Sequence, residues 1–147
     1  MKGRIFAALS IAAVVVMSTA AGAAVVGDGD QGGRPLTATL DGASERPAPG
    51  DPDGTGTATI SLNQGQGQVC FELTWDAIDT PTAAHIHEAP PSEPGPVVVP
   101  LDVAQPQGCV EADAALIKAI RQNPDAFYVN IHNAAFPGGA IRGQLTR

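Results

Sequence analysis

Residues 56–63 read Gly-Thr-Ala-Thr-Ile-Ser-Leu-Asn, and residues 68–76 read Gln-Val-Cys-Phe-Glu-Leu-Thr-Trp-Asp. In both stretches apolar side chains alternate with polar ones, which is typical of strands that bury only one face. The segment 64–67 between them contains two glycines and is typical of a turn. The sequence therefore predicts a β-hairpin. The apolar face of its second strand carries Val69, Phe71, Leu73 and Trp75.

Shorter segments on both sides of the hairpin extend the β pattern. We expect strands at residues 36–40, 83–88, 96–101, 109–110, 126–133 and 140–145. One segment departs from it: residues 112–122 place apolar side chains at helical spacing and end before Asn123-Pro124. The pattern predicts an all-β fold, an antiparallel Greek-key β-sandwich with one short crossover helix.

The N-terminus predicts export. Lys2 and Arg4 precede the apolar run 5–17, and Ala21-Gly22-Ala23 fits an A-x-A cleavage site. The apolar run is shorter than the ~20 residues that span a bilayer, so we predict a signal peptide at residues 1–23. A retained N-terminal anchor helix is the alternative. The expected location of the product is secreted or extracytoplasmic.

Cleavage after residue 23 would remove two of the eight basic residues and leave a net charge of −9, against −7 for the full chain. We expect a flexible Gly- and Asp-rich leader at 24–35 and a single domain at 36–147. Such an acidic chain has no basic stripe for nucleic acid and no attraction to anionic membranes. The acidic chain is compatible with a protein partner, which the sequence does not identify.

The chain has two cysteines, Cys70 and Cys109. An even count in an exported protein predicts a disulfide, with Cα atoms within roughly 7 Å. In the chain-entropy model, closing a loop of about 40 residues contributes roughly 3–4 kcal/mol to stability. The alternative is a cysteine metal site, for which the sequence offers no CxxC pair.

The chain has three histidines, and one residue separates His85 from His87. Alternate residues of a strand point the same way, so both rings leave one face of the sheet. His132 shares a strand with Val129 and Ile131, which point into the core, so His132 also points away from it. If the two strands are neighbours, the three rings meet, with nitrogens within about 4 Å for bonds of about 2 Å to one ion. Imidazole suits copper, zinc, iron and nickel.

Two other side chains are expected near the histidines. Glu88, beside His87, and Asn130, on the same face as His132, are candidates for orienting the rings by hydrogen bonds. Glu88 has a second interpretation as a surface charge, and the histidines themselves have a second interpretation as anchors that hydrogen-bond loop carbonyls. Arg142 is expected to hydrogen-bond loop carbonyls or a carboxylate.

Several segments in order resemble the CHRD domain, a module named after chordin that also occurs as a single secreted domain in bacteria. These segments are Ala84-His85-Ile86-His87, Gly95-Pro96-Val97-Val98, Tyr128-Val129-Asn130-Ile131-His132 and 137–145. The opening 40–47 is similar too, with Ser44-Glu45 where Asn-Glu is often found. The resemblance covers about residues 36–147. It implies an extracellular module without a settled molecular activity.

A narrower resemblance concerns the histidine segments. His85-Ile86-His87-Glu88 is similar to a copper-ligand strand of copper/zinc superoxide dismutases, and Ile131-His132 to their last copper-ligand strand. The resemblance implies three copper ligands on a sandwich of the immunoglobulin and superoxide-dismutase type. The chain has no counterpart of the fourth, zinc-bridging histidine or of the zinc-loop histidines.

The leading hypothesis is a secreted, non-catalytic CHRD-type binding module whose histidines His85, His87 and His132 bind copper or zinc. Two alternatives stay open. One is a copper-only oxidoreductase similar to superoxide dismutase. The other is a structural or adhesive extracellular domain that binds no metal.

Overall fold

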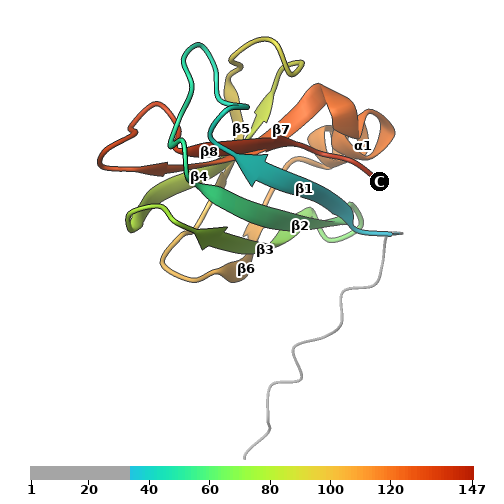
Figure 1. Cartoon of the computed structure of the whole chain (residues 1–147). Helices are drawn as coiled ribbons and strands as arrows, with labels where there is room; N and C mark the ends of the chain where they lie inside the picture. The colour runs from blue at the N-terminus through green and yellow to red at the C-terminus, as the bar shows by residue number, and fades with distance from the viewer. Residues whose placement is uncertain (1–33) are drawn as a thin grey trace, which may run out of the picture.

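The computed structural model describes residues 34–147, and in this range the chain forms eight strands, one α-helix and one 3-10 helix (Figure 1). The helix α1 spans Ala114–Gln122, and the 3-10 helix spans Pro124–Ala126. The predicted signal peptide, and the leader up to residue 33, lie outside the described residues. The strands are β1 Leu36–Asp41, β2 Thr55–Asn63, β3 Gln68–Asp76, β4 Pro81–Glu88, β5 Val97–Leu101, β6 Gln107–Glu111, β7 Phe127–Asn133 and β8 Ile141–Gln144.

The strands form one antiparallel sheet in the order β5-β4-β7-β8-β1-β2-β3-β6. The prediction of an all-β antiparallel fold with one helix is confirmed. Where a sandwich would have two separate sheets, the structure has a single one that curves round the core (Figure 1). The reason is β1, which pairs with β2 along its whole length and also meets β8 at Asp41 and Arg142. An isolated bridge between Thr37 and Thr146 extends this junction.

The core lies inside the curve of the sheet. Ile60 and Leu73 reach it from the β1-β2-β3-β6 half, and Ile86 and Ile131 reach it from the other half; each is at most 2% exposed. Full burial of a side chain of this size stabilises the fold by about 1.5–3 kcal/mol. The alternation read from the sequence therefore marks the face of each strand that lies in this core.

Helix α1 covers one end of this core. Ile117 and Ile120 are fully buried, and the Asp113 side chain caps the helix by accepting hydrogen bonds from two backbone N–H groups of the first turn. The helix begins two residues later than predicted because Asp113 is its N-cap. It ends at Gln122, and Pro124 starts the 3-10 helix that follows. Within the range described, no helix has the length and apolar character needed to cross a membrane.

Strands β4, β7 and β8 pack on the core with one face and are covered by loop segments on the other. The covered outer face forms the candidate site. Their outer face carries polar side chains that are nevertheless buried, including His87, Asn130 and Arg142. The register places residues of this face in rows across the three strands. One row is His85, Asn130 and Arg142, and the next is His87, Tyr128 and Gln144. The segments after β1 and after β4 lie over these rows, because Ser44 and Pro91 line a cavity together with Arg142 and Gln144.

Candidate metal centre

The three histidines come from two neighbouring strands. His85 and His87 lie on β4, and His132 lies on β7, which pairs with β4 so that Ala83 is opposite His132. The intervening Ile86 and Ile131 are fully buried in the core. The two conditions set by the sequence, adjacent strands and matching side-chain direction, are therefore both met.

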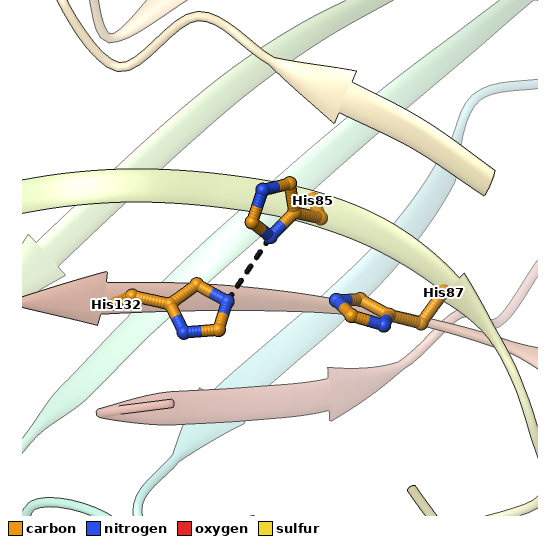
Figure 2. Close-up of side chains that lie close together, drawn as sticks. All are labelled: His85, His87 and His132. Atoms are coloured by element: carbon orange, nitrogen blue, oxygen red, sulfur yellow. Dashed lines mark hydrogen bonds between the residues drawn. The ribbon is translucent and has the colours of Figure 1, made fainter. Parts of the chain in front are cut away.

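The histidine rings converge on the outer face (Figure 2). His85 Nδ1 lies 3.0 Å from His132 Nε2. Taking one nitrogen from each ring, all three nitrogens lie within 4.8 Å of one another. The first distance meets the expected limit of about 4 Å, whereas the widest pair would have to close by about 1 Å to share one ion.

His87 offers a buried lone pair. Its Nδ1–H donates to the backbone carbonyl of Gly95 at 2.8 Å, so the neutral ring has its free electron pair on Nε2. This Nε2 atom is buried and has no hydrogen-bond partner among residues 34–147. The ring of Tyr128 stacks on His87 at 4.8 Å and 6°, and the Gly95 N–H donates to the Tyr128 hydroxyl at 3.1 Å. Leaving a buried acceptor unpaired costs free energy, which binding of a cation would recover.

His132 presents a second lone pair to the same point. Its Nδ1–H donates to the Pro137 carbonyl at 3.1 Å, so the neutral ring keeps Nε2 as an acceptor. That Nε2 atom faces Asn130 Oδ1 at 3.1 Å and His85 Nδ1. An Nε2 lone pair and an amide oxygen attract each other only when a proton or a cation lies between them, or when the amide presents its NH2 group instead.

The electrostatics keep the rings neutral. Burial lowers the pKa of His85 to about 4, with smaller contributions from the charges of His132 and His87. Burial also lowers the pKa values of His87 and His132, against the opposing effect of their hydrogen bonds to backbone carbonyls. Neutral imidazole is the form that binds metal ions, so at neutral pH the three rings are in the protonation state that a metal site requires.

Asn130 and Glu88, the two candidates for orienting the rings, lie in different surroundings. Asn130 is 2% exposed, lies opposite His85 in the register, and hydrogen-bonds within the histidine cluster. The Glu88 side chain is exposed, and it makes no hydrogen bond to a histidine among the described residues. The structure therefore brings Asn130 into the cluster and leaves Glu88 outside it, where its interpretation as a surface charge fits better.

A buried carboxyl group that sequence reasoning missed lies next to Asn130. Glu45 is 2% exposed, and burial raises its pKa to about 7 despite the nearby charge of Arg142 and a hydrogen bond from Asn130. Gly139 gives it room, since a Cβ at that position would overlap the Glu45 carboxyl group. The Gly139 φ of +136° also favours glycine.

Arg142 fixes the loop that covers the site. Its guanidinium donates to the carbonyls of Glu93 at 2.9 Å and Pro90 at 3.0 Å, and its central carbon lies 3.4 Å from the centre of the Tyr128 ring. The prediction that Arg142 hydrogen-bonds loop carbonyls is confirmed. Because Tyr128 also stacks on His87, the same contacts hold one of the three histidines in place.

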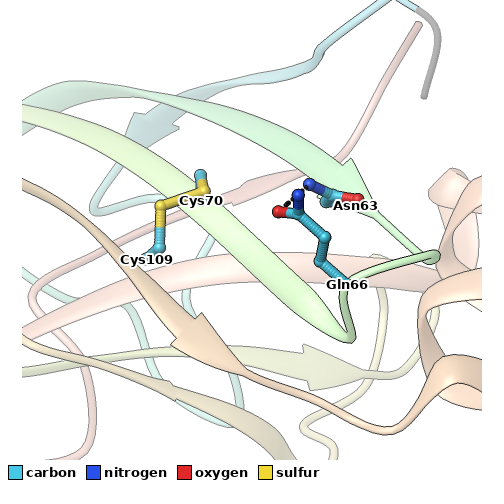
Figure 3. The surroundings of a disulfide bond; sticks show 4 residues. All are labelled: Asn63, Gln66, Cys70 and Cys109. Carbon is cyan, nitrogen blue, oxygen red and sulfur yellow. Dashed lines mark hydrogen bonds between the residues drawn. A yellow bond between two sulfur atoms is a disulfide. The ribbon is translucent and has the colours of Figure 1, made fainter. Parts of the chain in front are cut away.

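The predicted disulfide is present (Figure 3). Cys70 and Cys109 are directly opposite each other on β3 and β6, with Cα atoms 3.9 Å apart. The bridge fastens β6, which is an edge strand of the sheet, to its neighbour. With both thiols oxidised, the cysteines are not available as metal ligands, and the alternative of a cysteine metal site is removed.

The donor set therefore consists of three imidazoles without a thiolate or a carboxylate. Such a set suits copper and zinc, and the nitrogens best placed to bind are Nδ1 of His85 and Nε2 of His87 and His132. Asn130 contacts the cluster from the side, and Tyr128 with its loop partners covers it.

Fold and site together define an all-β, disulfide-linked domain that gathers its three histidines on one covered polar face. The family model of the CHRD domain matches residues 36–145, and the chain belongs to the CHRD domain family. The resemblance found in the sequence motifs is thus confirmed. The comparison with curated proteins found no match, and the comparison with solved structures found none either.

Proposed function

We propose that this protein is an exported CHRD-domain module that binds one copper or zinc ion through His85, His87 and His132. The observation that carries the proposal is the convergence of lone pairs. His87 Nε2 and His132 Nε2 are acceptors because each ring donates its other N–H to a backbone carbonyl. A cation between them and His85 Nδ1 satisfies all three nitrogens at once.

Export is supported by the disulfide and by the sequence of the N-terminus. A bridge between Cys70 and Cys109 forms and persists in oxidising surroundings outside the cytoplasm. Residues 1–23 have the order of a signal peptide, namely a basic start, an apolar run and a small-residue end. An extracytoplasmic domain meets metal ions that the cell does not buffer, which is where a site of this kind would act.

Copper is the stronger of the two candidates on chemical grounds. Nitrogen ligands bind Cu²⁺ more tightly than Zn²⁺ at the same site, so equal supply favours copper. Three neutral imidazoles bring no negative charge that would select a harder ion. Zinc, which is tetrahedral with three protein ligands in many open sites, remains the second candidate.

The test is a calorimetric titration of the mature, chelator-treated protein with Cu²⁺ and with Zn²⁺. We expect one equivalent to bind, and we expect His87→Ala to weaken binding at least tenfold. Glu88→Gln is the matched control, because it alters the neighbouring residue on the same strand without touching the cluster, and its affinity should equal that of the wild type. Circular dichroism of each variant verifies that the fold is retained.

The outcomes separate the competing functions. Failure of the wild-type protein to bind either ion, or equal binding by a folded His87→Ala variant, would leave a structural or adhesive domain in which the histidines anchor loops. A copper-loaded protein that consumes superoxide faster than a free histidine peptide with copper would move the assignment to an oxidoreductase. We expect no such excess, and a passive binding module.

A further inference from the structure

A small cavity lies at β8, the strand that pairs with β7 on the side away from β4. Its volume is about 100 Å³, and it lies between the segment after β1 and the segment after β4. The residues that line it are Ser44, Arg46, Pro91, Arg142 and Gln144. No carboxylate lines the cavity, although the chain as a whole has a net charge of −7. The cavity is therefore a positive feature on an acidic protein.

The cavity contains hydrogen-bond donors that the surrounding chain does not use. They do not come from Gln144, whose amide nitrogen already donates to two backbone carbonyls, of Ala89 and Asp125. Arg46 uses only one terminal nitrogen, which donates to the carbonyls of Ala43 and Glu45. A guanidinium has five N–H groups, so donors remain on this side chain.

Arg142 adds a charge that the protein balances poorly. The side chain is 1% exposed, and its hydrogen bonds go to carbonyl oxygens, which carry no formal charge. The acidic group that faces it is Glu45, and burial raises the pKa of that carboxyl to about 7, so Glu45 is only partly ionised at neutral pH. A buried guanidinium without a full counter-charge gains from an anion placed beside it.

We propose that this cavity is a binding site for a small oxyanion, a carboxylate or a phosphate, held by Arg46 and Arg142 with the Ser44 hydroxyl. Guanidinium groups bind oxyanions through charge-assisted N–H donors. Both arginines line this cavity: Arg46 has unused donors, and Arg142 contributes its positive charge. A cavity of about 100 Å³ has room for one small anionic group. The site does not depend on a bound metal.

The test is a titration of the metal-free, disulfide-intact mature protein with sodium phosphate and, separately, sodium acetate. Ionic strength is held constant with sodium chloride, and the readout is the NMR shift of the arginine Nε–H groups and of the Ser44 and Arg46 backbone amides. We expect saturable one-to-one curves for at least one of the two oxyanions. Arg46→Gln should weaken binding at least tenfold, and because Arg46 is partly exposed this variant should fold.

Lys118→Gln is the matched control, since it removes the same charge from an exposed position on α1 and should leave the dissociation constant unchanged. His87→Ala should also bind the oxyanion as the wild type does, which keeps this test independent of the metal proposal. Shifts that rise linearly with both anions, or equal weakening in Lys118→Gln and Arg46→Gln, would show diffuse charge screening and overturn the proposal.

Discussion

His85 Nδ1 lies 3.0 Å from His132 Nε2, a contact that joins residues 47 positions apart in the chain. The two residues are not directly opposite each other: His85 faces Asn130 in the register, and His132 faces Ala83. The contact is therefore diagonal, between neighbouring rows on one face of the β4–β7 pair. A slip of one residue would turn His132 to the other face and remove the site, so the register that buries Ile86 and Ile131 also fixes the histidine cluster.

Asn130→Leu should weaken metal binding by about 10–100-fold, the usual cost of losing a partner that orients metal ligands. Leucine has a similar volume but no amide group to hydrogen-bond with the histidine rings. The measurement is the Zn²⁺ dissociation constant from competition with a chelator. Glu88→Gln is again the control, because a change at Gln144 such as Gln144→Glu would disturb the covering loop. Unchanged affinity in Asn130→Leu would exclude an orienting role for Asn130.

His85 should make the metal-free protein less stable in acid. Its pKa is about 4 in the folded protein and near 6.5 when unfolded, so between these values the unfolded chain binds the proton and the folded one does not. Stability from this group is present above pH 6.5 and is lost as the pH falls toward 4. Urea unfolding from pH 7.5 to 4.5 should show a steeper loss for the wild type than for His85→Gln; parallel curves would contradict the lowered pKa.

Glu45 should act in the opposite direction. Burial raises its pKa to about 7 from 4.5, so the folded protein holds this proton over a range in which the unfolded chain has lost it. The stabilising effect is present below pH 4.5 and is lost as the pH rises through 7. The stability of Glu45→Gln relative to the wild type should therefore increase from pH 5 to pH 8, measured by urea unfolding. A difference that does not change with pH would show that Glu45 titrates normally.

Removing the disulfide should lower the free energy of unfolding by roughly 3–4 kcal/mol, as expected for a loop closed by residues 39 positions apart. The variant is Cys70→Ser with Cys109→Ser, and the measurement is chemical denaturation. The wild type in reducing agent is the control and should show the same loss. Equal stability of the double variant and the oxidised wild type would mean that β6 is held by its strand pairing alone.

Much of the fold could be predicted because apolar alternation reports which face of a strand is buried. The strand at 68–76 has the predicted bounds, and the direction of the three histidines followed from the same rule. The strand β6 begins at Gln107, two residues before the prediction, because Gln107 and Gly108 look like turn residues when their pairing with β3 is unknown. The single sheet was not predicted either, since the junction of β1 with β8 is a tertiary contact.

Glu45 shows what the sequence pattern could not supply. It lies in a Pro- and Gly-rich segment that predicts only a loop, and nothing local indicates that this loop crosses β8 and buries a carboxyl group beside Asn130. The residue Gly139 that makes room for it is about 94 positions away. Sites built from several loops over a sheet face depend on chain paths that periodicity does not encode.

The proposed metal ion binds to three named nitrogens, Nδ1 of His85 and Nε2 of His87 and His132. The direct measurement is a long-range ¹H–¹⁵N NMR spectrum of the imidazole rings before and after one equivalent of Zn²⁺. Metal binding at this site should shift the signals of those three nitrogens together, while the other nitrogen of His87 and of His132 keeps its proton. Imidazole signals that do not change on addition of zinc would contradict it.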